Sequence, residues 1–226
     1  MFYVHLVYLK MNQLTKLDIL IFKLVPNKIL RRVLHRIPRF KFLKETLNTQ
    51  TPISFEMFYN QMVLGKNRNV YWPVNPSSTV INYPNIYCGI ETSPGYSQGN
   101  YIQAFGKIYI GDYTQIGPNV GIISGNHDLH DNRKHTSKNI KIGKYCWLGM
   151  GSVILPGVQL GDYTIVAAGS IVTKSFNGHC VIGGNPAKKI KDLDATKCIE
   201  HKSEFEYNGF IPNSKFEAFR RKNLNV

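Results

Sequence analysis

His127 is the residue best suited to chemistry in this sequence, because it lies where an apolar repeat gives way to a polar stretch. Residues 128–139, which follow it, contain Asp, His, Asn, Arg and Lys but only one large apolar side chain, Leu129. An imidazole titrates near neutral pH and can accept the proton of an attacking hydroxyl group. His127 is therefore a candidate for acid–base chemistry, although a lone histidine is more often structural. Asp128, Asp131 or a backbone carbonyl can each hold its ring in one tautomer, and the sequence does not choose among them.

Aliphatic residues recur every six positions through most of residues 110–172. They are Ile110, Ile116, Ile122, Ile142, Leu148, Ile154, Leu160, Val166 and Val172. The residue four places after each is often small or β-branched, as at Thr114, Val120, Cys146, Ser152, Val158, Thr164 and Ser170. An amphipathic helix needs apolar residues at intervals of three and four, and a half-buried strand needs them at every second position. A period of six fits neither and is typical of a parallel β-helix.

Each position of the six has a physical role in such a fold. The aliphatic side chain stacks on its equivalents in the coils above and below and forms a buried column. The small residue points inward near a corner, where a large one would not fit. Insertions lie outside the coil and tend to carry function. The polar stretch after His127 is therefore expected to project from the coils.

With this six-residue repeat, residues of about 80 to 190 resemble the hexapeptide-repeat acyltransferases, the family of galactoside, maltose and serine acetyltransferases. The likeness is greatest to the bacterial O-acetyltransferases of surface polysaccharide biosynthesis. It rests on Ile116-Gly117-Pro118-Asn119-Val120, Asn126-His127-Asp128, Trp147-Leu148-Gly149, Ile154-Leu155-Pro156-Gly157-Val158, Ala168-Gly169-Ser170-Ile171-Val172-Thr173-Lys174 and Gly184-Asn185-Pro186-Ala187.

The resemblance implies a left-handed parallel β-helix and a homotrimer with its active sites between subunits. It also implies acetyl-CoA as co-substrate and no metal. The implied activity is direct transfer of an acetyl group to a sugar hydroxyl of a surface polysaccharide or its precursor, with His127 as the base.

The family's binding residues carry over to particular positions of this chain. The implied coenzyme-binding residues are Gly149, Met150, Ala168, Thr173, Lys174, Lys188 and Lys191. Among them, the Gly149–Met150 backbone is implied as the donor to the oxyanion, and the three lysines lie where basic residues meet the nucleotide phosphates. The acceptor site is less defined. Asn100, Asp128 and Tyr96 are its candidates, and Tyr101 and Trp72 are aromatic rings that could stack on a sugar.

The expected fold class is mainly β, a left-handed parallel β-helix with short N-terminal and C-terminal helical segments. We expect a basic helical segment at 1–50, a transition of irregular chain at 51–79, the catalytic β-helix at 80–190 with its loop at 128–139, and a helical tail at 191–226.

The positive charge of the chain is uneven. The net charge is +14, and residues 1–50 hold ten Lys or Arg against two acids. Residues 13–44 favour two amphipathic helices, with basic residues outside the apolar stripe. Such helices are expected first to pack against the coils, and peripheral contact with anionic lipid is the competing interpretation.

The cysteine usage and the N-terminal sequence favour a cytoplasmic location for the protein. If residues 13–44 bind lipid, we expect it at the inner face of the membrane. Four cysteines show no paired spacing and no zinc pattern. No apolar run reaches the ~18 residues of a spanning helix, and residues 1–10 lack the pattern of a signal peptide.

Three alternatives stay open. One is a serine or other small-molecule acetyltransferase of the same fold. Another is a gamma-type zinc carbonic anhydrase, since His130 and His135 have the spacing of one ligand pair, although no histidine lies between His35 and His127 to supply a third. The last is a basic membrane or polyanion binder. No nucleic-acid motif is present, so nucleic acid is not an expected partner.

Overall fold

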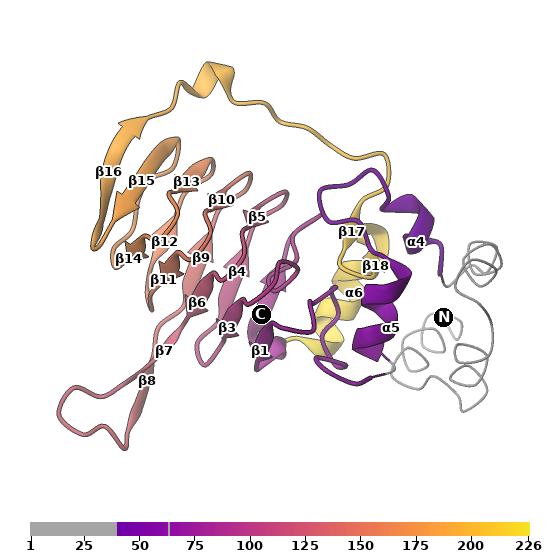
Figure 1. Ribbon diagram of the computed structural model, residues 1–226, viewed down its shortest axis with the longest axis horizontal. Helices are drawn as coiled ribbons and strands as arrows, with labels where there is room; N and C mark the ends of the chain where they lie inside the picture. The colour runs from indigo at the N-terminus through magenta and orange to yellow at the C-terminus, as the bar shows by residue number, and fades with distance from the viewer. Residues whose placement is uncertain (1–39, 63) are drawn as a thin grey trace.

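A computed structural model describes residues 40–62 and 64–226 of the chain. Its centre is a stack of coils with three parallel sheets as walls (Figure 1). The first sheet contains β1 (Thr79–Ile81), β3 (Tyr101–Gln103), β6 (Gly121–Ile123), β11 (Val153–Ile154) and β14 (Ile171–Val172). The second contains β2 (Ile86–Cys88), β4 (Ile108–Ile110), β9 (Ile140–Ile142) and β12 (Gln159–Leu160). The third contains β5 (Gln115–Ile116), β10 (Trp147–Leu148), β13 (Thr164–Val166), β15 (Cys180–Gly184) and the antiparallel edge strand β16 (Ala187–Asp192).

The aliphatic positions of the repeat form the core of this stack. Eight of the nine are buried, and Ile116 packs partly buried against the same core. Equivalent side chains lie directly above one another, as the pairing of Ile102 with Ile122 and of Ile122 with Ile154 shows. The predicted parallel β-helix is therefore confirmed. The three-walled stack is consistent with the left-handed coil that the resemblance implies.

The small residues of the repeat fill the corners, as predicted. All seven are buried, with exposed fractions of 2% or less. Thr114 shows why a small polar residue suits this place, because its Oγ1 donates to the Gly143 carbonyl (2.7 Å) and accepts from the Cys146 amide (3.1 Å). The Thr114 hydroxyl thus bonds one coil to the next and is itself fully paired.

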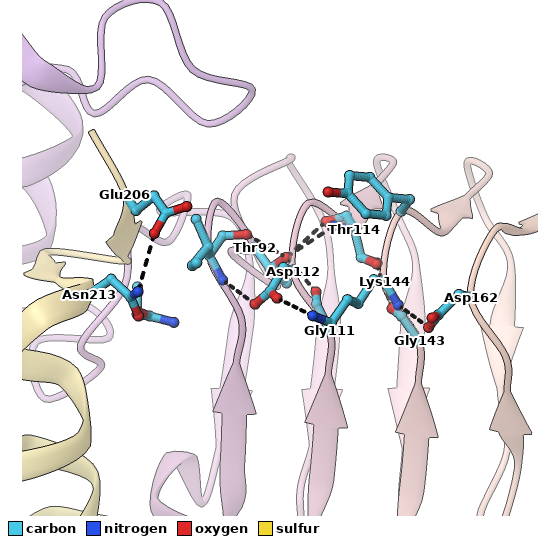
Figure 2. Close-up of polar contacts among 12 residues, drawn as sticks. Thr92, Gly111, Asp112, Thr114, Gly143, Lys144, Asp162, Glu206 and Asn213 are labelled. Atoms are coloured by element: carbon cyan, nitrogen blue, oxygen red, sulfur yellow. Dashed lines mark hydrogen bonds and ion pairs between the residues drawn. The ribbon is translucent and has the colours of Figure 1, made fainter. Parts of the chain in front are cut away.

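The corner between the second and third sheets carries a ladder of charged side chains (Figure 2). Asp112 accepts from the Ile90 amide (2.9 Å) and forms an ion pair with Lys144 (2.9 Å). Asp162 then accepts from the Lys144 amide (2.7 Å). The hydrogen bond to Asp112 raises the pKa of Lys144. These contacts bond each coil to the next along the outside of the corner.

One coil is much longer than the others. Adjacent strands advance by 18 residues from Val153 to Ile171, but by 32 from Gly121 to Val153. Most of the extra length forms an antiparallel hairpin of β7 (Gly125–His127) and β8 (His135–Ser137), which projects from the wall of coils (Figure 1). The stretch predicted as a loop at residues 128–139 is therefore the outer part of a hairpin.

The segments outside the coils pack at the β1 end of the stack (Figure 1). They contain α4 (Phe42–Glu45), α5 (Phe55–Met62), the hairpin of β17 (Tyr207–Asn208) and β18 (Ile211–Pro212), and α6 (Asn213–Asn223). Phe42, Phe58 and Phe210 form an aromatic cluster there, with ring centroids 5.5–5.9 Å apart. Short one-turn helices lie at Tyr83–Asn85 and Ala195–Lys197.

The predicted helical segments agree only in part with the described structure. Of the predicted helices in residues 13–44, residues 13–39 lie outside the described part. Residues 51–79, expected to be irregular, include α5. In the predicted C-terminal tail, an extended segment returns along the stack before α6 (Figure 1). Within residues 40–62 and 64–226, no helix has the length and apolar character needed to cross a bilayer.

The aliphatic column gives a direct test of the fold. Ile154 is fully buried between Ile122 and Val172. We expect Ile154→Ala to lower the free energy of unfolding by about 2–5 kcal/mol, since it removes buried methyl groups and leaves a cavity. Lys141→Ala on the exposed outer side of β9 is the control and should change it by less than about 0.5 kcal/mol. Denaturant unfolding measures both, and equal midpoints would contradict the assigned core.

Candidate active site

His127 ends β7 at the point where the hairpin leaves the coils, and its side chain is exposed. Its Nδ1 lies 2.6 Å from the carbonyl oxygen of Asn132. A carbonyl can only accept a hydrogen bond, so Nδ1 carries the proton and Nε2 holds the free lone pair. The backbone of the hairpin thus sets the tautomer that a base acting through Nε2 requires.

The two nearby carboxylates have other partners. Asp128 accepts from the backbone amides of His130 (2.9 Å) and Asp131 (3.0 Å), and so shapes the hairpin turn. Asp131 forms a bidentate pair with Arg133, at 2.8 and 3.1 Å, and this hydrogen bonding lowers the pKa of Asp131. Of the three groups that the sequence left open for orienting His127, the carbonyl is the one in contact. Sequence reasoning had no way to name Asn132, because a backbone group carries no sequence signal.

Three of the predicted coenzyme-binding residues share the corner between the third and first sheets. Gly149 lies against the next coil so closely that a Cβ there would be 2.6 Å from the Val166 carbonyl oxygen. Met150 and Ala168 project outward at the same corner, and 58% of Met150 is exposed. The Met150 carbonyl accepts from the Gly169 amide (2.8 Å). This corner presents the exposed side chains of Met150 and Ala168 beside the buried Gly149.

The remaining predicted coenzyme-binding residues lie elsewhere. Thr173 and Lys174 directly follow β14, at the corner between the first and second sheets, which is also the corner of the hairpin. The Lys174 ammonium lies 5.7 Å from the Phe176 ring centroid. Lys188 and Lys191 are exposed on the edge strand β16. The predicted set is therefore divided between two corners and one sheet edge of a single chain.

The first sheet separates His127 from Met150 within one chain. Met150 precedes β11, whereas His127 follows β6, the neighbouring strand of the same sheet. The corner-to-corner width of one wall is on the order of 15 Å for the few extended residues that span it. A single chain thus does not bring the imidazole and the Met150–Ala168 corner together.

The predicted acceptor-site residues are mostly held by the fold. Asn100 is 1% exposed, and its Nδ2 donates to the Gly117 carbonyl (2.8 Å) from an inward corner position. Tyr96 is half-buried, its hydroxyl donates to the Pro52 carbonyl (2.9 Å), and burial raises its pKa. Trp72 is fully buried with its indole N–H on the Pro94 carbonyl, so the prediction of an exposed stacking ring was wrong for Trp72. Tyr101 is 41% exposed on the first sheet.

The three buried cysteines offer no activated nucleophile. All four are free, and Cys88, Cys146 and Cys180 are buried. Burial raises the pKa of Cys88 and raises that of Cys146 to about 11. A thiol with a raised pKa stays protonated near neutral pH and is a poor nucleophile.

Thiol labelling tests this assignment. At pH 8 the native protein should react with an alkylating reagent at Cys198, the half-buried thiol, and not at Cys88 or Cys146 within the same time. Mass spectrometry of tryptic peptides identifies the modified residues, and denatured protein, labelled at all four, is the control. Rapid native labelling of Cys146 would contradict both its burial and its raised pKa.

The comparisons with known proteins agree with this architecture. Residues 139–174 match the family model of the bacterial transferase hexapeptide (six repeats). The chain is 34% identical over 111 residues to a galactoside O-acetyltransferase of Lactococcus lactis, covering 46% of this chain and 53% of the relative. It is 37% identical over 98 residues to the putative colanic acid biosynthesis acetyltransferase WcaF of Escherichia coli, covering 42% and 53%. The chain thus spans about half the length of these relatives.

Solved structures show the same fold. A galactoside acetyltransferase in complex with coenzyme A aligns with a TM-score of 0.50 and 24% identity, covering 82% of this chain and all of that one. A hexapeptide-repeat-containing acetyltransferase from Vibrio cholerae aligns with a TM-score of 0.51 and 22% identity, covering 74% and 92%. The coils of this chain therefore have the same fold as these two structures, and residues 139–174 match the hexapeptide family model.

A zinc site would need at least three ligands grouped in space. Across residues 40–62 and 64–226, no three His, Cys, Asp or Glu side chains are grouped as metal ligands would be. His130 and His135 lie on the hairpin, outside the coils.

Proposed function

We propose that this protein is an acetyl-CoA-dependent O-acetyltransferase that modifies a sugar hydroxyl. The observation that carries the proposal is His127, whose Nδ1 is fixed by a carbonyl on a hairpin projecting from a hexapeptide coil. Relatives named as galactoside and colanic acid acetyltransferases support the reaction and its acceptor class. The structural neighbour in complex with coenzyme A supports the acyl donor.

The reaction follows from the tautomer of His127. Its Nε2 accepts the proton of the sugar hydroxyl while the hydroxyl oxygen attacks the thioester carbonyl carbon. The tetrahedral intermediate carries an oxyanion, which the Met150 N–H would stabilise, since the Gly149 N–H already donates to the Val166 carbonyl (2.8 Å). The carbon–sulfur bond then breaks, and the leaving thiolate takes the proton from the imidazolium. The products are the sugar acetate ester and free coenzyme A, with no acyl-enzyme.

The proposed active site lies between two copies of the chain in a homotrimer. The separation of His127 from Met150 and Ala168 in one chain supports this arrangement, since a neighbouring copy can place its own corner against the hairpin. The coenzyme would run along Met150 and Ala168 of one subunit and reach Thr173 and Lys174 of another. Lys188 and Lys191 would then attract the nucleotide phosphates as point charges.

The acceptor is proposed to be a sugar unit of a surface polysaccharide or its precursor. The relative named for colanic acid biosynthesis supports this acceptor over a small free sugar. A small-molecule acceptor is the competing proposal, supported by the galactoside enzymes. The cytoplasmic location, the left-handed sense of the coil and peripheral membrane contact through residues 13–44 remain predictions.

Substitution of His127 tests the mechanism. We expect His127→Ala to lower kcat at least ~10²-fold with acetyl-CoA binding retained, because a general base is lost while the coenzyme groove is intact. Turnover is followed as thiol release with a panel of sugars, and coenzyme binding by calorimetry. His179→Ala, an imidazole at a different corner, is the control. Undiminished turnover of His127→Ala would remove His127 as the base.

Mixed trimers test the site between subunits. His127→Ala and Ala168→Trp, which would block the coenzyme path, should each be inactive alone. Co-expressed from differently tagged copies and purified through both tags, the mixed oligomers should regain part of the activity, because some interfaces pair an intact histidine with an intact corner. A site within one chain predicts no recovery, since every copy would carry one defect.

A further inference from the structure

The base of the hairpin places a second imidazole against His127. Residues His127 and His135 are direct partners in the antiparallel pairing of β7 with β8. Their ring centroids are 4.5 Å apart, with an angle of 44° between the ring planes. Directly opposed side chains of an antiparallel pair lie on the same face and contact each other. The two rings therefore pack together above the hairpin.

A third ring connects this pair to the coils. Phe105 follows β3 in the coil beside the hairpin, and its ring meets the His135 ring edge-on, with centroids 5.9 Å apart. Gly125 permits the approach, because a Cβ there would lie 2.4 Å from the Phe105 ring. The hydrogen bond from the Lys138 amide to the Ser124 carbonyl (2.9 Å) closes the base of the hairpin at the same level. A row of three rings thus runs from the end of β3 to the base of the β7–β8 hairpin.

Ring contacts at the base of the hairpin can hold the His127 imidazole in place. An isolated two-stranded hairpin is marginally stable in water, and His127 is exposed on one. The Asn132 carbonyl restrains one ring nitrogen, but it belongs to the same hairpin and moves with it. Catalysis by a general base is sensitive to position, and a misplacement of ~1 Å can cost ~10²-fold in rate. The contact between His135 and Phe105, a ring 43% exposed on the coils, comes from outside the hairpin and can restrain the imidazole relative to the coils.

We propose that His135 is a positioning residue for His127, supported by Phe105 and acting through ring packing. This inference rests on the proposed function, in which His127 is the base. His135 touches neither substrate nor coenzyme in this account. Its effect should therefore fall on kcat, disappear when His127 is absent, and be replaced by another aromatic ring.

The experiment is a comparison of variants in the thiol-release assay. His135→Ala and His135→Gln, which remove the ring, should lower kcat roughly 10- to 100-fold with the KM for acetyl-CoA unchanged. His135→Phe keeps the ring and should stay within about threefold of the wild type. Thr136→Ala, on the same strand with its side chain toward the opposite face, is the control and should match the wild type.

A double variant separates positioning from a general effect on the hairpin. In the His127→Ala background, His135→Ala should cause no further loss, since two residues that act as one unit are not additive. An equal further loss in that background would overturn the proposal. Two other results would also overturn it: a kcat of His135→Phe as low as that of His135→Ala, or a kcat of His135→Ala equal to that of the wild type. Full turnover of His127→Ala would instead remove the base and the proposed function, so the two failures are distinguished.

Discussion

The structure depends on the alignment of each coil with the next. The coils stack aliphatic side chains in columns, and most corners close with a small buried residue such as Thr114 or Ser152. A shift by one residue would turn the whole apolar set of a strand toward solvent. The period of six is therefore held by burial, and the outer hydrogen bonds of Asp112 and Asp162 follow the same alignment.

The alignment of the coils limits where reactive side chains can lie. A wall of stacked coils cannot bend toward a substrate without breaking its columns, so reactive groups must stand at corners or on chain that leaves the stack. The hairpin of β7 and β8 is the large excursion in the described part, and it carries His127. The exposed edge at Met150 and Ala168 lies at another corner. The division of the predicted site between corners is thus a consequence of the fold, and a second copy of the chain is the simplest way to join them.

The sequence predicted the coils well because their physics is local and repeated. Ile142 and Leu148 could be assigned to the core from spacing alone, and both are buried. Asn100 occupies the same inward corner position as Val120, but the repeat is broken upstream and its place could not be recognised. The Asn132 carbonyl and the His135 ring escaped prediction for another reason. Their contact with His127 depends on how a polar hairpin pairs, and polar strands carry little periodic signal.

In the proposed trimer, an imidazole on one chain and the Met150–Ala168 corner of another form one site for a thioester. A crystal structure of the protein with bound coenzyme A tests it most directly. We expect the coenzyme to lie between two copies, with its sulfur beside His127 of one copy and its pantetheine arm along Met150 and Ala168 of the other. Coenzyme bound wholly within one copy, or with its sulfur far from every His127, would contradict it.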